Sequence, residues 1–366
     1  MSRAIDAFLD EQIDAGRFPG AVYAVSGPEG LVDTGARGHA ALRPEPLPAS
    51  VDVVYDLASL TKPLVTSLLY LAIGKDLGLA PDLPARSILP ELDRIDKRDI
   101  TVRHLLTHSA GLADWFPLYM NGRTTAEYAR RIGEMPPVAP PGTRVIYSDL
   151  GYILMGEILS RAATEPLDRL AGQALFAPMG LKRTLFRPPP DWLPRVAPTE
   201  DSCQYERHLS RAVAGEQAMA YGGFRTGIVR GEVHDQNAWA AGGVAGHAGL
   251  FSTAAEVAAI GREFLGTGAG LLKGAALDQA RRDATPDLAE ARSVAFRLAL
   301  RGETAAGPDL PPATFGHNGF TGTSIWIDPE GQRVYVLLTN RVHPAVPDGS
   351  EMLPVRSRFH SIARTA

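Results

Sequence analysis

The tetrapeptide Ser59-Leu60-Thr61-Lys62 has the residue types and the spacing of a nucleophile beside its activating base. Residues three apart on a helix share one face, so the Ser59 hydroxyl and the Lys62 amine can meet. A serine hydroxyl is a weak nucleophile until a neighbour takes its proton, and a desolvated lysine can do so. The apolar run 63–73 predicts a helix that begins near Ser59, where its dipole favours negative charge. Alone, this pattern is more often a solvated helical turn.

Two further segments carry groups that could join this pair. Tyr147-Ser148-Asp149 precedes a predicted helix, and a tyrosine near a cation can lose its proton and act as a base. A loop tyrosine more commonly serves packing. His317-Asn318-Gly319 begins a glycine-rich strand, and glycines in a strand often mark the close approach of another backbone or of a ligand. A histidine there could contact a substrate or be a structural residue beside a bulge.

The three segments 59–62, 147–149 and 317–319, in this order, resemble the motifs of serine hydrolases related to class C β-lactamases and penicillin-binding proteins. The segments 100–112 and 246–253 look like parts of the same family. The resemblance runs from about residue 5 to residue 340. Each motif is weak alone, but the ordered set is specific.

The resemblance implies roles for particular residues. Ser59 would be the acylated nucleophile, Lys62 its proton partner, and Tyr147 the general base that also activates the deacylating water. The oxyanion hole would be the backbone N–H groups of Ser59 and Phe320, each contributing roughly 3–4 kcal/mol. Further substrate-binding positions are Asp149, His317, Gly319 and Trp115. Trp115, in the aromatic segment 115–119, could wall the acyl pocket or belong to a plain hydrophobic cluster. No cofactor or metal is implied.

The chain departs from the family pattern at two positions that face the substrate. Many relatives have Asn where this chain has Asp149, and an ionised Asp can only accept hydrogen bonds. β-Lactamases have Lys at the position of His317, and a histidine is mostly neutral at pH 7. Both changes disfavour an anionic β-lactam. We therefore expect an esterase or a D-amino-acid peptide or amide hydrolase, with Asp149 available to pair with a free amino group. A penicillin-recognising sensor that acylates without turnover, and a true β-lactamase, are the alternatives.

The distribution of predicted elements indicates an α+β fold of the β-lactamase/transpeptidase type. Strands are predicted at 20–26, 31–38, 323–328 and 333–340, near the two chain ends. Helices are predicted at the N-terminus, at 101–107, 124–132, 150–162 and 254–264, and from about Ser350. Thr253 and Glu256 form a capping-box pattern. We expect residues 1–75 and 245–366 to form an antiparallel sheet domain, residues 76–244 a mostly helical one, and the site to lie in the cleft between them.

Composition excludes several other classes. A net charge of −4 and a pI near 6.2 give no reason to expect nucleic-acid binding, and polybasic runs suited to a membrane are absent. Cys203, the single cysteine, excludes an intrachain disulfide and a cysteine-based zinc site, and we interpret it as incidental. The N-terminal residues lack the apolar core of a signal peptide. As written, the chain is expected to be cytoplasmic, or periplasmic or secreted if a leader was removed. The expected partner is a small-molecule or short-peptide substrate.

Other catalytic patterns are incomplete. The G-x-S-x-G of α/β-hydrolases is missing, with Ser109 nearest to it. His104 and His108 have the spacing of a zinc-peptidase pair, but Leu105 replaces the catalytic Glu. His234, Asp235, Asn237 and His247 could form a second polar site, and a buried structural network near the cleft is the preferred interpretation.

Overall fold

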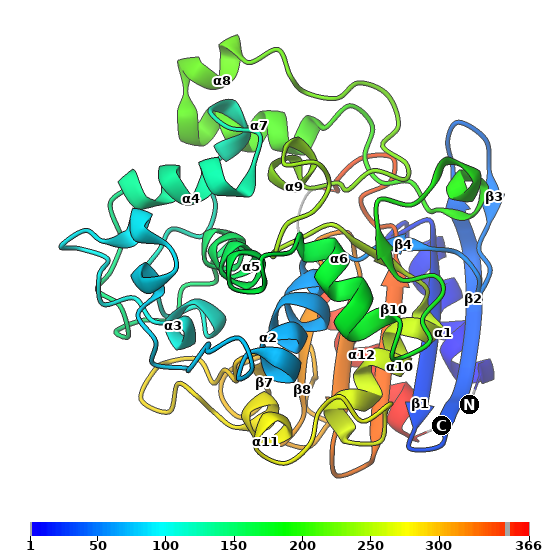
Figure 1. Cartoon of the computed structure of the whole chain (residues 1–366). Coiled ribbons are helices and arrows are strands. Elements are labelled where there is room, and N and C mark those ends of the chain that lie inside the picture. Colours follow the sequence, from blue (N-terminus) through cyan, green and yellow to red (C-terminus); the bar gives the residue numbers. More distant parts are fainter. Residues whose placement is uncertain (1, 348–351, 366) are drawn as a thin grey trace.

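The computed structural model describes residues 2–347 and 352–365 of the chain (Figure 1). Its main sheet has seven strands in the order β3-β2-β1-β10-β9-β8-β7, and every neighbouring pair is antiparallel. The strands are β1 (Gly20–Gly27), β2 (Gly30–Ala41), β3 (Leu47–Pro48), β7 (Arg297–Leu298), β8 (Phe315–Asn318), β9 (Ser324–Asp328) and β10 (Arg333–Thr339). Because β1 and β10 pair at its centre, the sheet joins the two chain ends. This confirms the predicted α+β fold.

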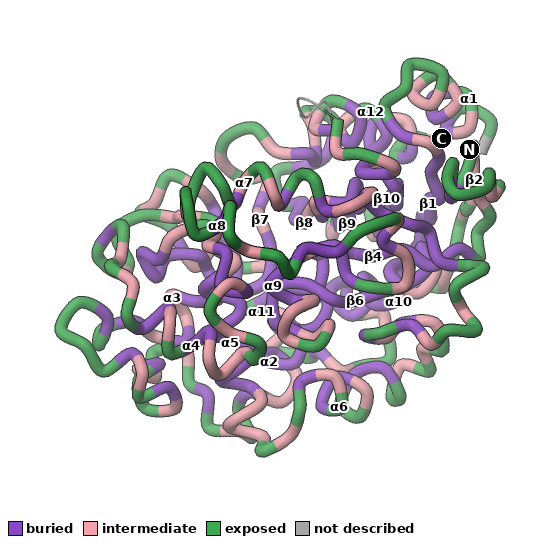
Figure 2. Tube along the Cα trace, turned by 90° about the horizontal axis from the view of Figure 1, so that it is seen from above, coloured by how far each residue is buried: buried purple, intermediate pink, exposed green. Residues whose placement is uncertain are grey.

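Both faces of the sheet are covered by helices, which explains why β1 is apolar without alternation. Tyr23 and Val25 pack in a core with helices α1 (Ser2–Asp14) and α12 (Met352–Thr365). Val22 and Ala24 point to the opposite face, which α10 (Ala254–Leu265) covers. Figure 2 shows the buried trace running through these strands and the exposed segments around them.

The rest of the chain supplies helices and one small sheet. β4 (Tyr55–Asp56) and β5 (Leu185–Phe186) both pair with β6 (Leu250–Ser252). The remaining helices are α2 (Leu68–Ile73), α3 (Val102–Leu106), α4 (Thr125–Glu134), α5 (Asp149–Ala163), α6 (Leu167–Ala171), α7 (Gln204–Ala214), α8 (Glu216–Ala220), α9 (Gln236–Ala240) and α11 (Ala275–Arg281). The division at 75/76 and 244/245 stays our proposal, and the small sheet crosses it. No helix within 2–347 or 352–365 has the length and apolar character to cross a membrane.

The predicted helices occur, with differences at their ends. The predicted start of the last helix, Ser350, lies outside the described residues, and α12 begins at Met352. At α10 only half of the capping box forms. The Thr253 side chain accepts from the Glu256 N–H, but the Glu256 carboxylate accepts from the N–H groups of Lys182 and Arg183 and from the Thr184 hydroxyl. The three donors at residues 182–184 therefore occupy the carboxylate that a complete capping box would use to accept from the Thr253 N–H.

Candidate active site

Ser59 lies in a strained turn and not at the start of an α-helix. Residues Ala58–Leu60 form a 3-10 turn, a π-helical segment follows over Lys62–Ser67, and α-helix begins only at Leu68. Ala58 has φ 48°, a left-handed conformation that is costly for a residue with a side chain. The Asp56 carboxylate, which accepts from the Ala58 N–H at 2.8 Å, holds the turn in this shape. The predicted helix near Ser59 thus occurs, but its first turns are 3-10 and π-helical, and Ser59 and Lys62 meet as expected.

Lys62 is fully buried beneath Ser59, and its ammonium group lies among several oxygen atoms. Its Nζ lies 2.9 Å from Ser59 Oγ, 2.7 Å from Asp149 Oδ1 and 3.1 Å from the His247 carbonyl oxygen. Burial by itself lowers the pKa of Lys62, but the nearby Asp149 and Tyr147 outweigh it and hold that pKa above its usual value. Lys62 is thus a cation. The first interpretation, in which a desolvated Lys62 amine takes the Ser59 proton, does not fit this charge.

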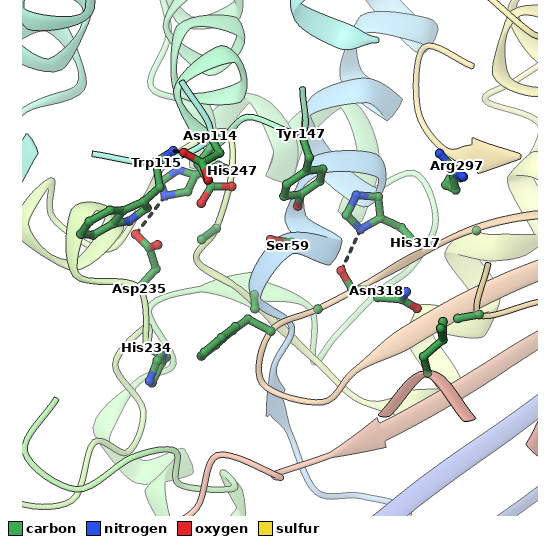
Figure 3. A pocket seen from close by; sticks show the side chains of 18 of the residues that line it. Ser59, Asp114, Trp115, Tyr147, His234, Asp235, His247, Arg297, His317 and Asn318 are labelled. Atoms are coloured by element: carbon green, nitrogen blue, oxygen red, sulfur yellow. Dashed lines mark hydrogen bonds and ion pairs between the residues drawn. The ribbon is translucent and has the colours of Figure 1, made fainter. Parts of the chain in front are cut away.

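Tyr147 is positioned by the loop that enters α5. Its ring centroid lies 5.0 Å from Lys62 Nζ and 4.5 Å from that of His108. His108 fixes the loop, since its Nδ1 accepts from the Ser148 N–H at 2.9 Å. The ring of Tyr147 points toward Ser59 (Figure 3). A tyrosine beside both the nucleophile and a cation can serve as the proton acceptor.

His317 and Gly319 come from β8 and the turn after it. His317 is buried, and its Nδ1 lies 2.9 Å from the Asn318 carbonyl oxygen. Burial, with the charges of Lys62 and Arg292, lowers the pKa of His317 well below its usual value, so the ring is neutral at pH 7. A Cβ on Gly319 would lie 2.5 Å from the Leu57 carbonyl oxygen, which confirms that this glycine marks a close backbone approach.

One cavity of about 690 Å³ brings the predicted residues together. Its lining includes Ser59, Trp115, Tyr147, Asp149, His317, Gly319 and Phe320. Of the predicted residues only Lys62 is outside the lining, because it lies below the floor with no exposed area. Trp115 lies at one end of the cavity (Figure 3), whereas Leu118 and Tyr119 are buried in the protein. Within the segment 115–119, Trp115 therefore lines the pocket, whereas Leu118 and Tyr119 have the predicted role of a plain hydrophobic cluster.

An acidic group lies at the Trp115 end. Asp149, Asp235 and His247 place ligand atoms within 4.8 Å of one another, a spacing that could hold a metal ion. Both carboxylates are already engaged, because Lys62 pairs with Asp149 and the His247 ring lies 2.9 Å from Asp235. Burial raises the pKa of Asp235, but His247 outweighs this effect and lowers that pKa to about 2. Burial and Asp235 raise the pKa of Glu206 well above its usual value. We interpret the group as an ion-pair network.

A basic group lies at the opposite end and was missed in the sequence. Arg292 and Arg297 both pair with the Glu290 carboxylate, so two positive charges share one negative charge. The Arg292 guanidinium also lies 5.6 Å from the ring centroid of Tyr147. No motif surrounds these arginines, and only the folding of 290–297 against β8 brings them to the site. They place positive charge near His317 that no sequence pattern indicated.

The predicted polar network consists of two separate pairs near the cleft. The His234 ring lies 3.1 Å from the Glu200 carboxylate, and the backbone N–H of His234 donates to the Asp56 carboxylate at 2.6 Å. The second pair is Asp235 with His247. The glycine-rich segment that precedes His247 serves close packing, since a Cβ on Gly156 would lie 2.8 Å from Gly246 Cα.

The histidines of the zinc-peptidase pattern do not share a helix. His104 caps α3, with its Nδ1 accepting from the Thr101 N–H at 3.2 Å. His108 lies beyond the end of that helix, with φ 58°. The two histidines therefore lack the arrangement on one helix that the zinc-peptidase pattern requires. Cys203 is buried, which raises the pKa of its thiol and agrees with an incidental role.

Comparison with known proteins identifies the family. A "Putative D-alanyl-D-alanine carboxypeptidase" from Escherichia coli O157:H7 is 30% identical, over 94% of this chain and 83% of the relative. Two solved structures share the fold. A penicillin-binding protein homologue from Caulobacter crescentus has a TM-score of 0.75 at 19% identity, with 99% of this chain and 96% of that one covered. EstCE1, described as a hydrolase with promiscuous acyltransferase activity, has a TM-score of 0.74 at 20% identity, with 99% and 98% covered. The Beta-lactamase family matches residues 5–353, and the chain belongs to this family of serine hydrolases.

Proposed function

We propose that the protein hydrolyses short esters and the peptides or amides of D-amino acids through an acyl-enzyme on Ser59. The observation that carries the proposal is the buried contact of Lys62 with Ser59 Oγ and with Asp149, at 2.9 and 2.7 Å, under the floor of the cavity. A buried lysine held as a cation beside a serine hydroxyl orients the nucleophile and stabilises an adjacent anionic base.

In the proposed reaction, Tyr147 takes the Ser59 proton while Oγ attacks the substrate carbonyl carbon. Lys62 stabilises the Tyr147 oxyanion that accepts this proton. The backbone N–H groups of Ser59 and Phe320 stabilise the substrate oxyanion, and Tyr147 returns the proton to the departing alcohol or amine. Water then attacks the carbonyl carbon of the acyl-enzyme while Tyr147 takes its proton. As the bond from this carbon to Oγ breaks, Tyr147 returns that proton to Ser59 Oγ, and the acid leaves.

The charges around the nucleophile support poor activity on anionic β-lactams. His317 is neutral, and the Arg292 guanidinium is engaged by Glu290 at 2.9 Å. A substrate carboxylate must therefore compete with Glu290 for this arginine. Asp149 is paired with Lys62, so binding of a substrate amino group would require its second oxygen.

A second candidate is a carboxypeptidase that removes a C-terminal D-amino acid. It is favoured by the sharing of one carboxylate between Arg292 and Arg297, which leaves net positive charge for a substrate carboxylate. The name of the 30% identical relative points in the same direction.

The test is turnover of a p-nitrophenyl butyrate, a D-alanine p-nitroanilide, an acyl-D-Ala-D-Ala peptide and a chromogenic cephalosporin, each with the wild-type protein and with Ser59→Ala. We expect steady-state hydrolysis of the ester or of a D-amino-acid substrate that Ser59→Ala abolishes. A cephalosporin efficiency equal to that for the best ester would overturn the proposed substrate class. A burst of one equivalent without turnover would instead indicate the sensor.

A further inference from the structure

The turn 319–323, which links β8 to β9, is fixed against the segment before Ser59. The Thr321 hydroxyl donates to the Asp56 carbonyl oxygen at 2.7 Å, and the Thr323 hydroxyl donates to that of Leu57 at 3.0 Å. The Gly319 N–H closes the turn by donating to the Thr323 carbonyl oxygen at 2.7 Å. These contacts set the position of the Phe320 N–H relative to the Ser59 turn.

Arg356 reaches this turn from α12. Its Nη2 donates to the carbonyl oxygens of Gly319 and Thr323, both at 3.0 Å. The residue is 7% exposed, lines the cavity, and pairs with no carboxylate among the described residues, while its Nε has no hydrogen-bond partner there. Burial, with the charge of Arg341, lowers the pKa of Arg356 to about 9, so the guanidinium is still a cation at pH 7. Buried charges are normally paired, and this one lacks a partner of opposite sign.

The Gly319 carbonyl belongs to the same peptide group as the Phe320 N–H. No described residue accepts a hydrogen bond from that N–H. A cation on the carbonyl oxygen polarises the amide and makes the N–H at its other end a stronger donor. The charge of Arg356 is therefore directed through one peptide group to the position where the substrate oxyanion would form.

We infer that Arg356 is a positioning residue that strengthens the oxyanion hole through the Gly319–Phe320 peptide group. Its missing counter-charge is then the negative charge that develops on the substrate carbonyl oxygen. The inference rests on the proposed function, because it takes the Phe320 N–H to be an oxyanion donor.

Arg341 offers a matched control. It is a second cavity-lining arginine that contacts the same turn, but its Nε donates to the Phe320 carbonyl oxygen at 3.0 Å. That oxygen belongs to the following peptide group, whose N–H is on Thr321. Both arginines pin the turn, so a merely structural role predicts similar effects for the two.

The experiment compares Arg356→Met, Arg356→Lys and Arg341→Met in ester hydrolysis. Because loss of a whole oxyanion donor costs about 10²–10³ in kcat, we expect loss of its polarisation in Arg356→Met to lower kcat about 10-fold, with KM nearly unchanged. On the same scale, we expect Arg341→Met to lower kcat only about 2–3-fold, because Arg341 contacts the following peptide group. Arg356→Lys retains the charge and should recover part of the rate. It also provides the reading if Arg356→Met does not fold.

The specific readout is the infrared carbonyl stretch of the acyl-enzyme, formed with a ¹³C-labelled ester and held at low pH. Weaker hydrogen bonding in Arg356→Met should move the stretch to higher wavenumber, while Arg341→Met should leave it near the wild-type value. Equal kcat losses in the two methionine variants, or an unchanged stretch in Arg356→Met, would overturn the inference. The absence of Ser59-dependent turnover in the wild-type protein would instead overturn the proposed function itself, and this outcome is distinguishable from both.

Discussion

Replacing Asp149 by Asn tests whether the charge of Lys62 depends on its ion pair. At 2.7 Å the attraction is roughly 6 kcal/mol at an effective dielectric of 20 and about 1.5 kcal/mol in bulk water. Lys62 has no exposed side-chain area and Asp149 is 19% exposed, so the true environment lies between these limits. We expect Asp149→Asn to lower the pKa of Lys62 and to reduce the free energy of unfolding by about 2–3 kcal/mol.

Thermal unfolding measures this loss directly. With about 2.1 cal/mol/K of unfolding entropy per residue, a loss of 2–3 kcal/mol lowers Tm by about 3–4 °C. The folded pKa of Lys62 lies above its usual 10.5, so its contribution is complete below pH 10.5 and is lost as pH rises through the folded value. The Tm difference should therefore persist at pH 7–9 and shrink above pH 10.5.

Enzyme kinetics provide the second measurement. If Lys62 must be a cation, the alkaline limb of kcat/KM should shift to lower pH in Asp149→Asn. Asp114→Asn is the control, since it removes an exposed carboxylate from the same cavity without touching Lys62. Its Tm should stay within about 1 °C of the wild type. An unchanged Tm and an unmoved alkaline limb in Asp149→Asn would refute the reasoning.

Three further predictions follow from the geometry of the site. Gly319→Ala should reduce kcat/KM at least about 100-fold, because its Cβ would meet the Leu57 carbonyl oxygen at 2.5 Å, whereas Gly172→Ala has open space and should retain activity. His317→Gln should give a wild-type-to-variant ratio of kcat/KM that does not change as the pH passes through 6.5, because the pKa of His317 lies well below that usual value, and a step near pH 6.5 would contradict this. Because the pKa of Asp235 is lowered to about 2, its carboxylate stabilises the fold above pH 3.8, and this stabilisation is lost as the pH falls toward 2. In urea unfolding, Asp235→Asn should therefore be about 2 kcal/mol less stable than the wild type at pH 6 and nearly as stable as the wild type at pH 2.

Much of the site could be predicted because its motifs are local and ordered. Each of the segments 59–62, 147–149 and 317–319 contains its own signal, and the strand patterns at the chain ends predicted the sheet that positions the last of them. The close approach at Gly319 was also visible, because a glycine inside a strand pattern needs a reason.

The remaining features depend on contacts between distant segments. Asp149 holds Lys62 as a cation, but the position of Asp149 at the start of a helix does not indicate which residue it pairs with. Arg292 and Arg356 lie in segments without any motif, and only β8 and its turn bring them to the cavity. The strained turn at Ala58 depends on Asp56, a buried carboxylate at the end of β4, and no local sequence pattern indicates this contact.

The placement of the cations explains how a β-lactamase-like site could prefer neutral acyl groups. Lys62 contacts the attacking oxygen, and Arg356 contacts the peptide group that faces the developing oxyanion. Both charges thus act on atoms that become negative only during the reaction, which is where binding energy accelerates it. The cation nearest to the position of a substrate carboxylate, Arg292, is instead held by Glu290. On the proposed function, a substrate carboxylate would first have to displace Glu290 from Arg292, whereas any acyl group that forms an oxyanion at Ser59 would gain the full effect.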